Sequence, residues 1–426
     1  MARDKVISAI DVGSNKVTTV VASVDADGKA SVIGVSTVPS AGLRKGQVVD
    51  IEAAVAAISS GVDAAERMAG LSIGSAFVSV GGAHIQSQNS KGVVAVAEPE
   101  GEITKVDIKR VTDAARAISI PSSREILHVI PRGYIVDGQE GIKDPVGMTG
   151  VRLEVETQIV TGATTTVRNL AKCISQIGID IDGLVYSGLA SSYSTLSETE
   201  KELGVILVDI GAGTTDVAIY VDGALSYSSV IPIGAKNVTN DLAIGLRVSL
   251  ESAEKIKLAL GTKPKFAVEK SKEDDELDVT GLGLAEELKK VSKKTLIEGI
   301  IKPRLSEVFT YVGMELQKSE LTGLTPSGLV ITGGGAETIG ILDIARSRLV
   351  MPVRIGTPTG LTGLVDEISN PKFATAYGLI LYGLENGVTQ KSAGLPKLPG
   401  FASIVSKLPL KNIFGKATGF LKNFLP

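Results

Sequence analysis

Two stretches of the chain, about 200 residues apart, repeat one pattern of apolar and polar positions. Residues 8–39 and 205–234 each read as an apolar strand, Asp-[Val/Ile]-Gly, a turn of small residues, a second strand, a Gly-bearing hairpin and a third strand. Asp11 aligns with Asp209, and Gly13 with Gly211. Because two copies so far apart indicate a duplicated domain rather than a solenoid, the pattern predicts a two-lobed α/β protein with a cleft.

The spacing of apolar residues changes several times between the two repeats. Residues 49–70 have helical spacing and residues 75–82 alternate as a strand. Short alternating runs around one helical pattern at 106–118 then occupy residues 84–162. This change predicts a small inserted α+β module, and the name inserted module is used for it below.

The helix and strand rhythm returns after the inserted module. Residues 164–178 are predicted to be a helix, residues 180–188 a strand and residues 235–260 helical. Residues 284–320 predict two helices separated at Pro303, because proline lacks the N–H group that a helix interior requires.

Each repeat carries a turn of small residues that suits an anion. Glycines in LVDIGAGTTD (207–216) leave backbone N–H groups open to phosphate oxygens, and IDVGSNK (10–16) adds a lysine as a point charge. One such turn alone is more often structural, but two in register predict loops that clamp a polyphosphate from both sides. The predicted phosphate contacts are Gly13, Ser14, Asn15, Lys16, Gly211, Ala212, Gly213, Thr214 and Thr215.

Asp11 and Asp209 each lie at a strand end directly before these turns. Since Mg²⁺ keeps several waters and prefers one or two carboxylates together with phosphates, the pair predicts a Mg²⁺ site. By contrast, a single cysteine and two histidines leave thiol and metalloenzyme chemistry without the residues they need.

A third glycine-rich stretch, VITGGGAETIGIL (330–342), runs from a strand into a helix start, where open N–H groups and flat glycines suit a base or sugar. The spacing is not that of a dinucleotide-binding fold. In SLESAEKIKLALG (249–261), Glu254 and Lys257 share a helical face, and an ordinary surface ion pair is the alternative to a ligand contact.

These stretches, in the order IDVGSNK, VDIGAGTTD, ESAEKIK, ITGGGAE and NPKFATAYG, are similar to the five-segment ATP site of the actin, DnaK-type chaperone and sugar-kinase superfamily. Within it the chain most resembles the FtsA family of actin-like bacterial cell-division proteins, on residues 128–154, 188–205 and 230–243. The resemblance covers residues 5–426 and implies an actin-like, duplicated ribonuclease H-like ATPase fold.

The resemblance implies four subdomains. Subdomain 1A would comprise residues 1–83 and 163–203, with 361–386 returning to it, and the inserted module, 84–162, would be subdomain 1C. Subdomain 2A would comprise 204–240 and 322–360, subdomain 2B 241–321, and a flexible linker at 387–409 would precede a membrane-targeting helix at 410–426.

The resemblance also implies roles in binding ATP and Mg²⁺. Asp11 and Asp209 would face the metal, and residues 13–16 and 211–215 the phosphates. Glu254 and Lys257 would meet the ribose and base, with Gly334, Gly335 and Ala336 beneath the adenosine and Gly234 among the binding residues.

Hydrolytic relatives place Gln or Glu before the second phosphate loop, where this chain has Ser187 or Gly188. Without such a side chain to orient water, slow ATP turnover at most is expected. A small-molecule kinase of the same superfamily is a weaker alternative, because no acidic base is evident beyond Asp11 and Asp209.

The last residues are basic and amphipathic. After Glu385 the chain has six lysines and no acid, so residues 386–426 carry +6 and residues 1–385 carry −9, which together give the net charge of −3. Wound as a helix, residues 410–425 gather their apolar side chains in one arc, which predicts insertion into an anionic membrane rather than nucleic-acid binding; docking on the protein's own body is the alternative. The predicted membrane contacts are Leu410, Lys411, Ile413, Phe414, Lys416, Phe420, Leu421, Lys422, Phe424 and Leu425.

The resemblance implies a protein that polymerises on the cytoplasmic face of the cell membrane at the division site. It would tether the FtsZ ring there and recruit later divisome proteins. Arg304, in a matching Pro-Arg segment, and the neighbouring Lys293 and Lys294 would bind the acidic C-terminal peptide of FtsZ. An adaptor of another envelope assembly, similar to PilM, is the alternative. No run of about 18 apolar residues predicts a membrane span or a secretory signal.

Overall fold

The computed structural model describes residues 5–97, 101–261 and 275–387. The expected membrane-targeting helix, and all but the first residue of the expected linker, lie outside these ranges. Met1–Glu385 form one compact unit, which holds every element below except the last residue of α11. No helix in the described ranges is both long enough and apolar enough to cross a bilayer.

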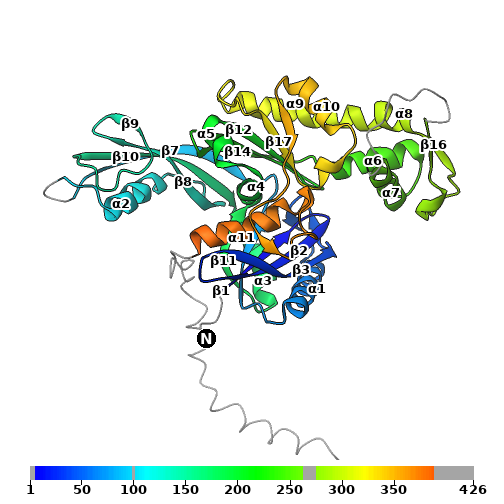
Figure 1. Ribbon diagram of the computed structural model, residues 1–426, viewed down its shortest axis with the longest axis horizontal. Helices are drawn as coiled ribbons and strands as arrows, with labels where there is room; N and C mark the ends of the chain where they lie inside the picture. Colours follow the sequence, from blue (N-terminus) through cyan, green and yellow to red (C-terminus); the bar gives the residue numbers. More distant parts are fainter. Residues whose placement is uncertain (1–4, 98–100, 262–274, 388–426) are drawn as a thin grey trace, which may run out of the picture. The chain divides into compact units, whose positions relative to one another are not determined.

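Two sheets carry the two sequence repeats (Figure 1). The first has the strand order β11-β6-β1-β2-β3-β19 and the second β14-β13-β12-β17-β18. The first sheet contains β1 (Lys5–Val12), β2 (Lys16–Val24), β3 (Ala30–Pro39), β6 (Ser75–Val80), β11 (Asp180–Tyr186) and β19 (Thr362–Gly363). The second contains β12 (Val205–Ile210), β13 (Thr215–Val221), β14 (Ala224–Ile231), β17 (Leu329–Thr332) and β18 (Val353–Ile355).

The two sheets share their topology and their register. In each, three antiparallel strands are followed by a strand that pairs in parallel with the first, β6 with β1 and β17 with β12. Asp11 lies opposite Thr18 in the first hairpin, and Asp209 lies opposite Asp216 in the second. The predicted duplicated α/β fold is therefore confirmed.

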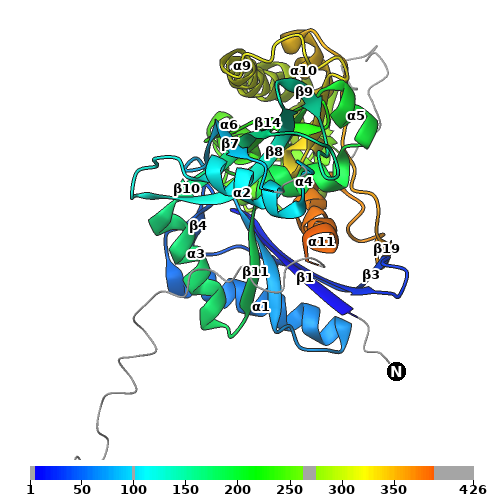
Figure 2. The ribbon, with the colours of Figure 1, turned by 90° about the vertical axis from the view of Figure 1, so that its left-hand side faces the viewer.

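Helices cover both faces of the first sheet. Helices α1 (Ile51–Ala69) and α3 (Thr164–Gln176) lie on one face and α11 (Ala374–Asn386) on the other (Figure 2). Helix α4 (Ser187–Thr195) packs between the two sheets and against α11. A Cβ on Gly378 of α11 would overlap the Ala190 carbonyl oxygen, so glycine allows this close approach.

The inserted module folds around its own sheet, with the order β7-β10-β8-β9, and one helix. Its strands and helix are β7 (Gln86–Ala95), β8 (Arg124–Val136), β9 (Gln139–Ile142), β10 (Arg152–Ala163) and α2 (Lys105–Arg116). A small separate core, which includes Ile103, Val111 and Leu153, fills the space between α2 and the sheet. The predicted helix near residues 106–118 is confirmed.

The remaining elements lie mostly in the second half. They are β4 (Leu43–Arg44), β5 (Gln47–Val48), α5 (Glu198–Leu203), α6 (Ala235–Leu246), α7 (Leu250–Gly261), β15 (Glu276–Asp278), a 3-10 turn η2 (Thr280–Leu282), β16 (Lys290–Ser292), α8 (Lys293–Leu296), a π-helical turn η3 (Ile297–Ile301), α9 (Lys302–Lys318), a 3-10 turn η4 (Gly334–Glu337), α10 (Ile341–Leu349) and a 3-10 turn η5 (Pro371–Phe373).

Two helix predictions were wrong in detail. The stretch 235–260 is two helices, because Arg247 takes a left-handed conformation with φ 57° and ends α6. Pro303 does not separate two helices. The π turn η3 runs directly into α9, so Pro303 lies within a continuous helical segment, directly after the wider π turn. Residues 284–289 are not helical.

Candidate functional site

One open cleft brings together most of the predicted site residues. It is lined by the turns after β1 and β12, the glycines after β17, one face of α7 and the segment before α11. The predicted residues that line it are Asp11, Gly13, Ser14, Asn15, Lys16, Asp209, Gly211, Ala212, Gly213, Thr214, Glu254, Lys257, Gly334 and Gly335. Thr215, Gly234 and Ala336 lie behind this lining.

The first turn is closed by a hydrogen bond from Gly13 N to Lys16 O of 3.0 Å. The Lys16 ammonium lies 3.8 Å from the centroid of the Phe373 ring and donates to Thr18 Oγ1. No carboxylate of the described residues lies within ion-pair distance of it. Burial lowers the pKa of Lys16 to about 8, against the pull of Asp11. A phosphate would supply the counter-charge that this lysine lacks.

The second turn has the same closure, from Gly211 N to Thr214 O at 2.9 Å. The start of α6 braces it, because Lys236 N donates to Ala212 O. A Cβ on Gly234 would lie 2.6 Å from the Ala212 carbonyl oxygen. Gly234 therefore shapes the loop from behind. Thr215 donates to Ile233 O, so its hydroxyl is directed away from the cleft as well.

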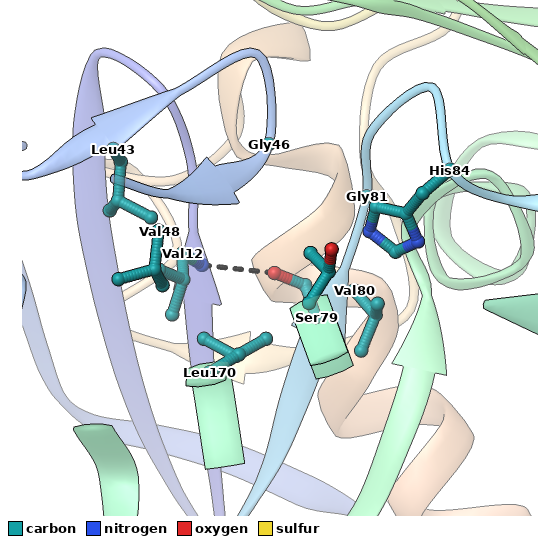
Figure 3. Close-up of a pocket in the computed structure, with 10 residues that line it drawn as sticks. Val12, Leu43, Gly46, Val48, Ser79, Val80, Gly81, His84 and Leu170 are labelled. Carbon is teal, nitrogen blue, oxygen red and sulfur yellow. Dashed lines mark hydrogen bonds between the residues drawn. The ribbon is translucent and has the colours of Figure 1, made fainter. Parts of the chain in front are cut away.

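Ser79 holds the carboxylate of Asp11 from behind the first turn. Ser79 Oγ donates to Asp11 Oδ1 at 2.8 Å. It also accepts from Val12 N at 2.9 Å, as the dashed line in Figure 3 shows. This serine lies on β6, next to a small pocket lined by the β4–β5 hairpin. Sequence reasoning missed it, because its contact with Asp11 spans 68 positions.

Asp209 accepts a hydrogen bond from Thr375 Oγ1 at 3.1 Å. Burial, and then the negative charge of Asp11, raises the pKa of Asp209 to about 6. Burial also raises the pKa of Asp11. A buried carboxylate whose pKa is raised by a neighbouring, partly buried one fits a divalent cation beside the pair, because the cation offsets the repulsion.

A third carboxylate, Asp216, also lines the cleft. It is 5% exposed, and its Oδ1 has no hydrogen-bond partner among the described residues. Burial, followed by the charges of Asp209 and Asp11, raises its pKa well above the ordinary range. The prediction that the cleft offers no candidate acidic base beyond Asp11 and Asp209 was therefore wrong. The signal was its position seven residues after Asp209, directly opposite it in the hairpin.

Helix α7 supplies the wall opposite the glycines. Lys257 Nζ and Glu254 Oε2 form the ion pair expected for their spacing, at 2.8 Å, and both contact Thr239 Oγ1. The pair also faces the cleft, so the two sequence interpretations are compatible. Leu250 and Leu258 line the same wall and are both 51% exposed.

Ser187, the first residue of α4, also lines the cleft. Gly188 does not, and a Cβ there would lie 2.7 Å from the Tyr186 ring. Neither residue offers a carboxylate or carboxamide, as the sequence indicated.

The residues expected to bind a partner lie on α8 and α9. Arg304 forms a two-point ion pair with Asp241, at 2.6 Å from Nε to Oδ2 and 3.0 Å from Nη2 to Oδ1, and it also contacts Glu307. Its side chain is 24% exposed. Lys294 N donates to Asp275 Oδ1. Arg304 would therefore meet an acidic partner while already bound to two acids of its own chain.

Two hairpin sheets of equal topology, with their turns facing one cleft, define an actin-like fold. Solved structures of that class match. A chain of the "PilM-PilN type IV pilus biogenesis complex" aligns with a TM-score of 0.63 at 16% identity, over 89% of this chain and 98% of that one. The "Crystal structure of MreB 5 of Spiroplasma citri bound to AMPPNP" aligns with a TM-score of 0.52 at 16% identity, over 90% and 99%.

Sequence comparison is more specific than the fold. The family described as "SHS2 domain inserted in FTSA" matches residues 82–161, and "Cell division protein FtsA" matches residues 206–378. The chain is 42% identical to the FtsA of Pseudomonas aeruginosa, over 89% of this chain and 90% of the relative. It is 40% identical to that of Borreliella burgdorferi over 100% of both, and 37% to that of Escherichia coli K12 over 90% and 91%. The chain belongs to the FtsA family of cell division proteins.

Proposed function

We propose that this protein binds ATP with Mg²⁺ in the cleft and acts in cell division as a membrane-tethered, self-assembling filament. The observation that carries the nucleotide proposal is the pair of turns with the same closing hydrogen bond. One holds a partly buried lysine that has no ion-pair partner among the described residues, and the other lies beside the buried carboxylates of Asp209 and Asp216. The MreB structure of similar fold is described as bound to AMPPNP, which supports the same use of this cleft.

Within this proposal, different residues of the chain bind different parts of the ligand. The turns 13–16 and 211–214 bind the phosphates, and Asp11 and Asp209 hold Mg²⁺ through its waters. Glu254 and Lys257 meet the ribose and base, and the glycines 334–335 lie beneath the adenosine. Bound Mg²⁺ would supply charge neutralisation at the phosphates.

The test is equilibrium binding of a fluorescent ATP analogue to the full chain with and without Mg²⁺. Micromolar or tighter affinity that weakens at least tenfold without Mg²⁺ is expected. An affinity that does not depend on Mg²⁺ would remove the metal site, and no binding would remove the cleft assignment. ATP turnover is expected to stay below about one per second, because Ser187 cannot activate water as a carboxylate would.

Membrane tethering is proposed from residues 410–426. In flotation with vesicles that contain anionic lipid, the full chain should float and a chain ending at Gly387 should stay in solution. If both stay in solution, the tether is elsewhere or absent. Nucleic acid is not expected to bind.

FtsZ binding is proposed at Arg304 with Lys293 and Lys294. Charge reversal at Arg304 is a poor test, because it would place a third carboxylate beside Asp241 and Glu307. The variant Arg304→Gln should weaken binding of the FtsZ C-terminal peptide. The matched variant Asp241→Asn removes one of the two acids that Arg304 contacts and should keep or strengthen this binding. Equal weakening by both would mean that the ion pair only shapes this surface.

A further inference from the structure

The inserted module contacts the rest of the protein through strand packing and side-chain hydrogen bonds, not only through its chain connections. Strands β7 and β8 lie beside β14 (Figures 1 and 2). Ser87 Oγ donates to Ser228 O at 2.6 Å and accepts from Ser228 N at 3.2 Å. At the rim of this contact, Lys143 pairs with Glu202, and both side chains are largely exposed.

One contact reaches the end of strand β11. The backbone N–H of Tyr186 donates to Nε2 of His128, on β8 of the inserted module, at 2.9 Å. Strand β11 is at the edge of the first sheet, so its outer N–H groups have no neighbouring strand. A buried N–H group without a partner is costly, and His128 supplies the partner. Burial lowers the pKa of His128 to about 4, so the imidazole is neutral and free to accept.

Tyr186 connects this histidine to the cleft. Its side chain is fully buried, and its hydroxyl donates to Ser229 O on β14 at 3.1 Å and lies 3.4 Å from Val217 O on β13. The same hydroxyl lowers the pKa of Asp216, which burial raises. The residue that follows Tyr186 is Ser187, which lines the cleft. Tyr186 is thus held by the inserted module on one side and adjoins two cleft residues on the other.

We propose that His128 and Tyr186 are positioning residues of the nucleotide cleft, and that through them the occupancy of the cleft and the placement of the inserted module are coupled. The proposal rests on nucleotide binding as proposed above. If the module shifts, either the Tyr186 N–H loses its acceptor or Tyr186 follows and moves Ser187 and the hydroxyl near Asp216. By reciprocity, a bound nucleotide that fixes those residues restrains the module.

Affinity for Mg²⁺–ATP in the full chain tests the cleft side. His128→Leu, which removes the acceptor, and Tyr186→Phe, which removes the hydroxyl, should each weaken binding about 5-fold or more. His128→Gln, which keeps an acceptor near the position of Nε2, should recover most of the loss. The matched control is Lys143→Ala, which breaks a contact of the same interface at its exposed rim and should leave affinity unchanged.

Hydrogen exchange tests the module side, first in the wild-type chain and then in two of these variants. Mg²⁺–ATP should slow exchange of the β8 amides around His128, and this protection should be lost in Tyr186→Phe and kept in Lys143→Ala. Wild-type binding with no protection of β8, or equal affinity in all variants, would overturn the coupling alone. A wild-type chain that binds no nucleotide would overturn the proposed function and the coupling with it.

Discussion

The two halves of the molecule build the same hairpin from different chemistry. Both turns close with a glycine N–H bonded to the carbonyl three residues later, at 3.0 and 2.9 Å. At that closing position the first half has Lys16 and the second has Thr214. Opposite the leading aspartate the first has Thr18 and the second Asp216. The cation is therefore in one half and the extra carboxylate in the other.

The halves also differ in what interrupts them. The first is interrupted after β6 by the inserted module, and the second after β14 by the helices α6–α9. A duplicated backbone thus presents two equal loops to the cleft, while the insertions give each half a separate surface. The two turns therefore share their backbone geometry but differ in the side chains that they present to the cleft. Substitution of one side chain in each turn tests this difference.

The largest expected effect is at the closing position of the turns. Lys16→Met should weaken ATP binding by roughly 100-fold, about 3 kcal/mol, because the buried phosphates lose their charged partner. Thr214→Val, at the same place in the second turn, should lose only about 1 kcal/mol, the value of one neutral hydrogen bond. Titration calorimetry of both variants makes the comparison. Equal losses would show that Lys16 does not contact phosphate.

The local part of this site could be predicted from sequence. The two Asp-x-Gly turns, the helix over 51–69 and the strand over 75–80 arise from short-range spacing of glycine and apolar residues, and the structure has them at those places. The i,i+3 pair of Glu254 and Lys257 was equally local.

What sequence reasoning missed depends on contacts between distant residues. Ser79 supports Asp11 from another strand, and Asp241 binds Arg304 across 63 positions. Asp216 was overlooked because it lies within an apolar strand, and only its pairing with Asp209 across the hairpin indicates that its side chain reaches the cleft. Helix α6 ends because the backbone of Arg247 takes the left-handed conformation, which is uncommon for residues other than glycine. Helix propensities therefore do not predict this end.

The opposite charges of the two halves predict a pH window for binding. Above pH 8 Lys16 loses its proton, since its pKa in the empty cleft is about 8, and affinity should fall about tenfold per pH unit. Below pH 6 Asp209, with a pKa of about 6, becomes protonated and the Mg²⁺-dependent part of the affinity should fall. Binding measured from pH 5 to 9.5 should therefore peak between 6 and 8.

Two controls separate the limbs of that profile. Lys16→Arg should remove the alkaline limb, because a guanidinium stays charged. In a titration without Mg²⁺, the affinity should still change with the ionisation of the ATP phosphates. The further loss of affinity below pH 6 that depends on Asp209 and Mg²⁺ should be absent. If the affinity of Lys16→Arg still falls above pH 8, a group other than Lys16 causes the loss.

A smaller effect is expected where the halves differ at Thr18 and Asp216. Asp216→Asn should raise the free energy of unfolding of the nucleotide-free chain by about 1 kcal/mol at pH 7.5, because it removes a buried ionisable carboxyl whose charge is disfavoured by burial and by Asp209 and Asp11. The gain should shrink near pH 4, where the raised pKa leaves the wild-type carboxyl protonated. Urea unfolding measures both. The exposed Asp63→Asn should stay within about 0.5 kcal/mol, and a loss of stability in Asp216→Asn would mean that this carboxylate is structural.

The smallest effect concerns an ion pair that joins the halves outside the cleft. Arg354 of β18 binds Glu200 of α5 through two hydrogen bonds of 2.6 Å. Mainly because of these hydrogen bonds, the pKa of Glu200 is lowered to about 2. Ionised Glu200 therefore stabilises the folded chain above its unfolded pKa of about 4.5, and that contribution is lost as the pH falls from 4.5 toward 2. Because Arg354 is 42% exposed, solvent screening reduces the contribution to about 0.5–1 kcal/mol.

Glu200→Gln should lower the free energy of unfolding by that amount at pH 7 and by less at pH 3, whereas Glu202→Gln, at the more exposed pair with Lys143, should change it little. If the two variants behave alike, the halves are joined by the packing of α4 and α11 rather than by this charge.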